Sequence, residues 1–231
     1  MAMKPSSELW GVGIYSLAEA SRLTGVNAQR IGRWVSGYSF QSSGRRHESD
    51  PVWARQLPII DDKYALGFLD LMEVRFVKAF MDQGVSLHSI RRAALRAKEL
   101  FRVDHALCTN MFLTDGRTIL AEVGEESGEK ELLDLVKNQY AFNKVLRPYL
   151  SGVEFEEKIV ARWWPIGEKK KVVIDPGRSF GAPITSDRGI QTKILATAVK
   201  TEDNLDVVAN WYEVSKQEIR DAVKFEMSIA A

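Results

Sequence analysis

The sequence YSLAEASRLTGVNAQRIGRWV, residues 15–35, predicts two short helices separated by a tight turn. Ser16 and Glu19 have the spacing of a capping box, which marks the start of the first helix. Gly25 permits the left-handed conformation that ends a helix, and Asn27 is a preferred N-cap for the second one. We therefore expect a helix-turn-helix whose second helix ends near Val35.

The second predicted helix has one apolar and one polar side. Ile31, Trp34 and Val35 share the apolar side, and the opposite side carries Gln29, Arg30 and Arg33. Arginine and glutamine side chains are the ones that read guanine and adenine edges in the major groove of DNA. A plain helical hairpin in an all-α domain would explain the apolar spacing equally well.

Charge favours DNA binding over the plain hairpin. Over residues 15–46 there are five basic residues and one acid, Glu19, a local net charge of +4. Such an asymmetry is the electrostatic requirement for a nucleic-acid site. The basic residues are Arg22, Arg30, Arg33, Arg45 and Arg46.

The whole chain is not a polycation. Its 231 residues carry 32 basic and 31 acidic side chains, so any nucleic-acid site must come from local asymmetry. The single cysteine, Cys108, excludes an internal disulfide, and three scattered histidines make a zinc site improbable. We expect no metal and no cofactor.

The composition also gives expectations about location. Hydrophobic residues make up 45% of the chain, enough for a real core, but no apolar run is long enough to cross a bilayer. The first ten residues lack the apolar segment of a signal peptide. We expect a cytoplasmic protein with no membrane partner.

Residues 37–58 form a polar stretch rich in glycine and serine. Such a composition suits the wing of a winged helix or a disordered excursion. Arg45, Arg46 and His47 would lie at the tip of a wing, against phosphates or in a minor groove. The alternative, that these are simply solvated loop charges, remains open.

Two further helices are predicted over residues 66–80 and 86–102. The second should place Leu87, Ile90, Ala94 and Leu95 inward. Its outer surface is strongly basic, which is either a solvated face or a supporting contact to the DNA backbone. We favour the backbone contact. The residues selected for it are Arg91 and Arg92.

The middle of the chain has a different pattern. An Asp-Gly turn at Asp115 and Gly116 predicts a β-hairpin over residues 110–123. Alternation over residues 153–163 predicts one half-buried strand, which could equally form a dimer contact. Pro165 and Gly167 mark a domain boundary. We expect a fold that is mainly α with minor β, in three domains. Residues 1–104 form an N-terminal winged helix-turn-helix, and residues 105–167 form a small α/β connecting or dimerisation region. Residues 168–231 form a C-terminal trihelical helix-turn-helix-like domain.

The C-terminal domain contains an internal echo of the opening stretch. Residues 205–223 align with residues 17–35 without a gap, at a constant offset of 188. Core positions agree, with Leu205 on Leu17 and Ile219 on Ile31, and Trp211 falls on Leu23. Ser215 and Glu218 repeat the capping box. Helical hairpins can also share this spacing by chance.

The echo reverses charge at the positions that would touch DNA. Glu218 replaces Arg30 and Asp221 replaces Arg33. Residues 202–226 contain seven acids and three bases, a net charge of −4. Carboxylates at these positions would repel phosphates, so we expect the second unit to bind a protein partner with a basic surface.

The C-terminal run VVIDPGRSFGAPI, residues 172–184, resembles the uncharacterised-domain family numbered four-thirty-three: a strand, an Asp-Pro step, a Phe-Gly-x-Pro turn and three helices. The N-terminal half is similar to a MerR-type helix-turn-helix. Together the two resemble the VapB-like antitoxins of bacterial type II toxin–antitoxin pairs.

This resemblance implies an antitoxin that binds operator DNA as a homodimer, represses its own operon and neutralises a PIN-like ribonuclease toxin. The DNA-binding set is Arg22, Asn27, Gln29, Arg30, Arg33, Arg45, Arg46, Arg91 and Arg92, and the toxin-binding set is Glu213, Glu218 and Asp221. An acidic surface could occupy the basic substrate site of a ribonuclease. The rival hypothesis is a stand-alone transcriptional regulator with a ligand-sensing C-terminal domain. An enzyme is not expected, because the sequence has no phosphate-cradling glycine motif and no recognisable nucleophile.

Overall fold

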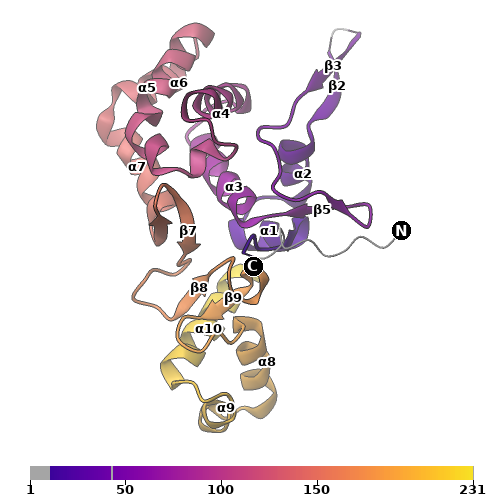
Figure 1. Cartoon of the computed structure of the whole chain (residues 1–231), viewed down its shortest axis with the longest axis vertical. Helices are drawn as coiled ribbons and strands as arrows, with labels where there is room; N and C mark the ends of the chain where they lie inside the picture. Colours follow the sequence, from indigo (N-terminus) through magenta and orange to yellow (C-terminus); the bar gives the residue numbers. More distant parts are fainter. Residues whose placement is uncertain (1–10, 43, 231) are drawn as a thin grey trace. The chain divides into compact units, whose positions relative to one another are not determined.

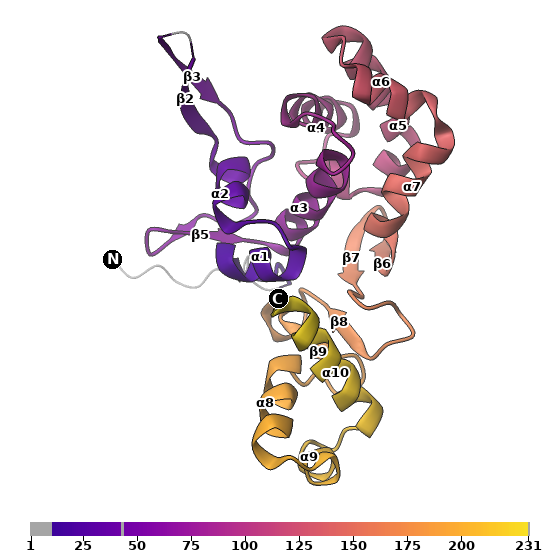
Figure 2. The same cartoon turned by 180° about the vertical axis from the view of Figure 1, so that it is seen from behind.

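The computed structural model describes residues 11–42 and 44–230, which form two compact units. The N-terminal unit comprises Tyr15–Leu150 and Glu156–Val160. The C-terminal unit comprises Ser151–Phe155, Ala161–Ala231 and the described residues before Tyr15. Both units are mainly helical with small antiparallel sheets, which confirms the predicted class (Figure 1 and, from behind, Figure 2).

The first two helices are α1, Leu17–Thr24, and α2, Ala28–Ser36. The capping box is present, since the Ser16 hydroxyl accepts the Glu19 N–H and the Glu19 carboxylate accepts the Ser16 N–H at 2.8 Å. Gly25 ends α1 with φ 69°. The Asn27 side chain accepts the Gln29 N–H at 2.9 Å and caps α2. These predicted helix ends are confirmed.

An antiparallel ribbon follows α2. It consists of β2, Tyr38–Ser42, and β3, Arg45–Ser49, with Phe40 opposite His47. Figure 1 shows this ribbon extending from the end of α2. A second sheet combines β1 (Tyr15–Ser16), β5 (Lys63–Leu66) and β4 (Ile59–Ile60) in the order β1-β5-β4. The sequence is compatible with either a wing or a disordered loop in this region, and the structure has a paired hairpin.

Helices α3, Phe68–Met81, and α4, Leu87–Phe101, correspond to the two predicted helices. The predicted inward position of Leu95 is wrong, because this side chain is 57% exposed. The buried stripe of α4 instead follows Ile90, Ala93, Ala94 and Ala97. Its small side chains allow close packing against α5, which leaves the longer Leu95 on the outer side.

The predicted hairpin at residues 110–123 is wrong: these residues belong to helix α5, Asn110–Ser127. Phe112, Gly116, Ile119 and Val123 are buried at helical spacing. A Cβ atom on Gly116 would come within 2.6 Å of the Phe112 ring, so glycine here serves packing rather than a turn. Before α5 lies a short 3-10 helix, η2 (Ala106–Cys108), and after it α6 (Lys130–Lys137) and α7 (Gln139–Leu150).

The predicted single strand over residues 153–163 is also wrong. Two strands form, β6 (Val153–Glu156) and β7 (Ile159–Trp163), because Glu157 adopts φ 55° and reverses the chain. They continue into β8 (Val172–Ile174) and β9 (Pro183–Thr185) in the sheet order β6-β7-β8-β9. A short 3-10 helix, η3 (Ser179–Gly181), precedes β9.

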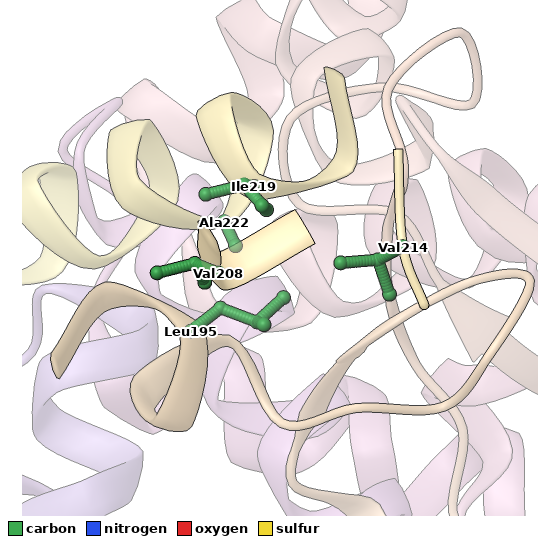
Figure 3. Close-up of a cluster of buried hydrophobic side chains, with 5 residues drawn as sticks. All are labelled: Leu195, Val208, Val214, Ile219 and Ala222. Atoms are coloured by element: carbon green, nitrogen blue, oxygen red, sulfur yellow. The ribbon is translucent and has the colours of Figure 1, made fainter. Parts of the chain in front are cut away.

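Three helices complete the C-terminal unit: α8 (Thr192–Glu202), α9 (Leu205–Tyr212) and α10 (Lys216–Ile229). Their core contains Leu195 from α8, Val208 from α9, and Ile219 and Ala222 from α10. Val214, in the turn between α9 and α10, completes the cluster (Figure 3). The three helices follow two strands, β8 and β9, rather than the single strand of the expected pattern.

Candidate nucleic-acid interface and partner surface

The polar side of α2 is exposed as the sequence predicts. Ile31 is fully buried and Trp34 and Val35 are each 2% exposed, which fixes the rotation of the helix. Gln29, Arg30 and Arg33 are therefore on the solvent side. The helix presents one amide and two guanidinium groups together, the side-chain chemistry that reads base edges.

Aromatic rings hold the two arginines of α2. The guanidinium carbon of Arg30 lies 5.9 Å from the centre of the Trp34 ring, and that of Arg33 lies 5.9 Å from the centre of the Tyr38 ring. These cation–π contacts restrict the side chains while their donors stay exposed. Because Tyr38 opens β2, the second contact joins the helix to the ribbon.

The β2–β3 ribbon carries cations on both faces. Arg45 pairs with Ser42 and Arg46 with Gln41, so the two arginines point to opposite sides of the ribbon. Both are exposed. The Phe40 ring stacks on His47 with centroids 5.3 Å apart, an exposed aromatic pair on the face of Arg45.

The remaining predicted DNA-binding residues have different surroundings. Arg22 and Asn27 are exposed, and the Asn27 amide oxygen is occupied by its cap. Arg91 and Arg92 are only half exposed, and Arg92 forms an ion pair with Glu126 of α5. Further along α4, Arg96 lies 3.6 Å from Glu122, and Lys98 lies 2.7 Å from Asp104. Acidic neighbours thus neutralise much of the basic surface of α4.

The first turn of α3 contains a buried carboxylate, Asp70, that fixes the chain entering this helix. Asp70 accepts hydrogen bonds from Trp53 Nε1 at 2.8 Å, the Gly67 N–H at 2.8 Å and the Gln56 N–H at 3.1 Å. Burial raises the pKa of Asp70 to about 6, although these donors act in the opposite direction. Sequence reasoning missed this group, because Asp70 lies within an apolar helical stripe.

A second buried polar pair joins α3 to η2. His105 Nδ1 lies 3.8 Å from Glu73 Oε1, and both side chains are nearly inaccessible. Burial lowers the pKa of His105 to about 4, so this imidazole is neutral at pH 7, and burial raises the pKa of Glu73 well above its usual value. Within the described ranges, no group of three His, Cys, Asp or Glu side chains is placed to hold a metal ion.

The helix pair α9–α10 repeats the local architecture of α1–α2. Each boundary of α9 and the start of α10 differ from those of α1 and α2 by the same offset of 188. Val208, Val214 and Ile219 are buried like Ala20, Val26 and Ile31. Ser215 forms its capping box with Glu218.

Two positions in the echo depart from the alignment. Trp211 is 61% exposed, so its predicted core position is wrong. Glu213 adopts the left-handed conformation of Gly25, with φ 52°, and its exposed carboxylate lies 3.7 Å from Arg188. The turn geometry is conserved between the pairs although only one of them uses glycine.

The expectation that Glu218 and Asp221 lie on a solvent-exposed helix face is wrong. Their side chains are buried, with 4% and 2% of each residue exposed. Glu218 caps its own helix, and Asp221 accepts hydrogen bonds from the Lys171 N–H at 3.2 Å and Gln217 Nε2 at 2.9 Å. Strand β8 packs on this face of α10. A contact of these two carboxylates with a toxin stays a prediction.

The acidic stretch therefore presents fewer free carboxylates than its sequence suggests. Besides the two buried groups, Asp206 pairs with Lys216 of α10. Glu226 accepts a hydrogen bond from Thr192. Glu202 and Asp203 are exposed at the end of α8. Most of the negative charge is used within the unit.

The structure describes no helix with the length and apolar character that crossing a bilayer requires. No protein-family model matches the chain.

Two comparisons cover nearly the whole chain. A protein from Mycobacterium tuberculosis described as "Putative antitoxin VapB45" is 27% identical over 224 residues, which are 92% of this chain and 93% of that protein. The X-ray crystal structure of Rv2018, also from Mycobacterium tuberculosis, has a TM-score of 0.71 and 27% identity, over 93% of this chain and 99% of that one. The chain is thus similar in sequence to the first protein, and in sequence and fold to the second, over more than nine tenths of its length.

Proposed function

We propose that this chain is the antitoxin of a type II toxin–antitoxin pair and that it binds operator DNA to repress its own operon. In this proposal α1 and α2 form a helix-turn-helix and β2–β3 is its wing. The observation that carries the proposal is the exposed polar side of α2, where Arg30 and Arg33 lie beside a ribbon with cations on both faces. The similarity to a protein described as an antitoxin supports it.

The proposed DNA contacts follow from exposure. Gln29, Arg30 and Arg33 enter the major groove and read base edges. Arg22, Arg45 and Arg46 contact phosphates, and Asn27 lies at the N-terminal end of α2, where backbone N–H groups favour an anion. Arg91 and Arg92 would add a supporting contact to the DNA backbone. Arg92 would leave its ion pair with Glu126 to reach a phosphate.

The proposed partner is a PIN-like ribonuclease, bound by the C-terminal domain, residues 168–231. Of the predicted toxin contacts, Glu213 is exposed and accessible. Glu218 and Asp221 would have to leave their hydrogen bonds within the unit to reach a toxin. We further propose a cytoplasmic homodimer, because operator half-sites are commonly bound by two-fold symmetric proteins.

A DNA-binding titration tests the first half of the proposal. The double variant Arg30→Ala, Arg33→Ala removes both guanidinium groups from α2, and we expect its affinity for the chain's own promoter DNA to fall by roughly 100-fold or more. The wild-type affinity should fall steeply with salt, and the variant should show a shallower slope by about two contacts. Fluorescence anisotropy over a salt series measures both quantities.

A matched control removes two cations elsewhere. Arg220→Ala, Lys224→Ala takes two exposed charges from α10 and should leave the affinity for promoter DNA within about twofold. Equal loss in both double variants would show that net charge alone, rather than α2, governs binding. Unchanged binding by the Arg30, Arg33 variant would refute the recognition-helix assignment.

Co-purification tests the second half. The full chain is co-expressed with the product of the neighbouring reading frame, and we expect a stable complex in which ribonuclease activity of the neighbour is inhibited. DNA binding without any such complex would favour the stand-alone regulator.

A further inference from the structure

An apolar groove lies on the C-terminal unit, between the end of α8, the start of α9 and the last turns of α10. Val199, Leu205, Val223 and Met227 line it, and its volume is about 480 Å³. The Met227 side chain is 72% exposed. Val199, Leu205 and Val223 are half buried, so the groove leaves part of the apolar surface of three helices accessible.

The equivalent position in the N-terminal unit is closed. There, a Cβ atom on Gly32 would lie 3.5 Å from Leu17 Cδ1, an ordinary contact distance across the α1–α2 packing. Val35, on the same helix, is 2% exposed. In the C-terminal unit Arg220 occupies the place of Gly32, and Val223, the counterpart of Val35, is only half buried. One substitution of the echo thus coincides with the opening of a groove.

Two cations border the groove. Arg220 and Lys224 are one turn apart on α10, both exposed, and neither has a carboxylate within 4.0 Å among the residues that the structure describes. Five other cations of the unit do face carboxylates: Arg162, Lys170, Lys171, Arg188 and Lys216. The groove therefore combines an apolar floor with unneutralised positive charge.

We propose that this groove binds an amphipathic helix of the toxin, with its apolar side on Val199, Val223 and Met227 and with Asp or Glu residues beside Arg220 and Lys224. Helices that dock in grooves use apolar anchors at three- and four-residue steps, which matches an apolar floor with a charged edge. DNA does not suit the site, because phosphates gain nothing from apolar side chains. This inference rests on the proposed function, since it names the surface by which the antitoxin meets its toxin.

Binding of the full chain to the purified product of the neighbouring reading frame, measured by calorimetry, tests the inference. Met227→Asp places a charge in the groove, and Arg220→Glu, Lys224→Glu reverses its edge. We expect each to raise the Kd roughly tenfold or more. The matched control, Lys169→Glu, Lys193→Glu, makes the same charge change at two exposed sites outside the groove and should stay within about twofold.

The outcomes separate this inference from the proposed function. Unchanged toxin affinity in both groove variants, in chains with wild-type melting temperature, overturns the groove while the antitoxin proposal stands. No complex with the wild-type chain overturns both. Conversion of a dimer to a monomer by Met227→Asp with toxin affinity unchanged would assign the groove to a second copy of the chain and so overturn the toxin helix. The Arg30→Ala, Arg33→Ala variant should bind the toxin normally.

Discussion

The helix pairs α1–α2 and α9–α10 share three helix boundaries, a side-chain cap at the start of each helix and three buried core positions, but they use the outer side of the second helix differently. In α2 that side carries Arg30 and Arg33 into solvent. In α10 the corresponding Glu218 and Asp221 are buried, and Asp221 accepts a hydrogen bond from the N–H of Lys171, the residue before strand β8. An aligned charge reversal therefore does not by itself identify a surface, because the rest of the fold decides whether that side of the helix is exposed.

The accessible surface of the second helix pair lies on another side of α10 than the aligned positions predict. Because β8 covers one side of α10, the exposed side chains Arg220, Lys224 and Met227 lie elsewhere on the helix. The same helical scaffold therefore offers a polar, cationic side in one unit and an apolar groove in the other. Three predictions test this difference, and the first changes stability most.

Removing the matched core side chains should break each pair separately. Ile31 and Ile219 are both fully buried and are related by the offset of 188. Ile31→Ala and Ile219→Ala should each lower the free energy of unfolding by about 2–5 kcal/mol, through lost burial and a cavity. Amide hydrogen exchange in α2 and α10 measures which unit each variant affects. A loss below about 1 kcal/mol at Ile219 alone would mean that the two pairs are not structurally equivalent.

The pH dependence of stability should separate the two units, because all three histidines belong to the N-terminal one. The pKa of His105 is about 4 in the folded chain against 6.5 when it is solvated, so its protonation favours unfolding as the pH falls from 6.5 to 4. The pKa of Asp70 is about 6 against 3.8, so its protonation favours folding over nearly the same range. The two effects largely cancel in the wild-type chain.

His105→Gln removes one side of this balance. Relative to wild type, the variant should gain up to about 3 kcal/mol of stability between pH 6.5 and pH 4. Urea unfolding at several pH values measures the gain in stability, and hydrogen exchange of the α3 amides reports the stability of the N-terminal unit. The α10 amides serve as the internal control and should show no such change. Parallel pH profiles for variant and wild type would contradict the assignment of a neutral, buried His105.

The aligned positions Arg33 and Asp221 should give opposite results when each is truncated. Asp221→Ala leaves the Lys171 N–H and the Gln217 amide without their acceptor and should cost about 1–3 kcal/mol of stability. Arg33→Ala removes an exposed side chain and should change stability by less than about 0.5 kcal/mol, while it weakens DNA binding. Thermal unfolding and DNA titration of the two variants give the four values. Equal stability losses would contradict the difference in burial.

Local signals in the sequence predict much of the fold. The capping residues Ser16, Asn27 and Ser215 act within one helical turn, so their spacing alone locates α1, α2 and α10. The echo at an offset of 188 likewise predicts the limits of α9. The exposed arginines of α2 follow from helical periodicity, because the buried Ile31 fixes the opposite side.

Local sequence patterns predict the wrong element where tertiary contacts determine the structure. The Asp-Gly pair at residues 115–116 resembles a turn, but Gly116 makes room for the Phe112 ring. Alternation over residues 153–163 does not reveal that Glu157 reverses the chain. The burial of Asp221 depends on β8, fifty residues earlier in the chain. The groove beside Met227 has no sequence signature, because it forms where three helices meet.

The burial of Glu218 and Asp221 has an evolutionary consequence for the second helix pair. By alignment alone, Glu218→Arg with Asp221→Arg would give α10 the charges that α2 carries at its proposed DNA-reading positions. In the folded unit each guanidinium would instead enter a space shaped for a shorter carboxylate, and at position 221 it would face the N–H donors that now bond Asp221, which typically costs several kcal/mol. Such intermediates would unfold before they bound DNA. DNA recognition through α10 would therefore require this side of the helix to be released from its packing first, and two substitutions alone would not provide it.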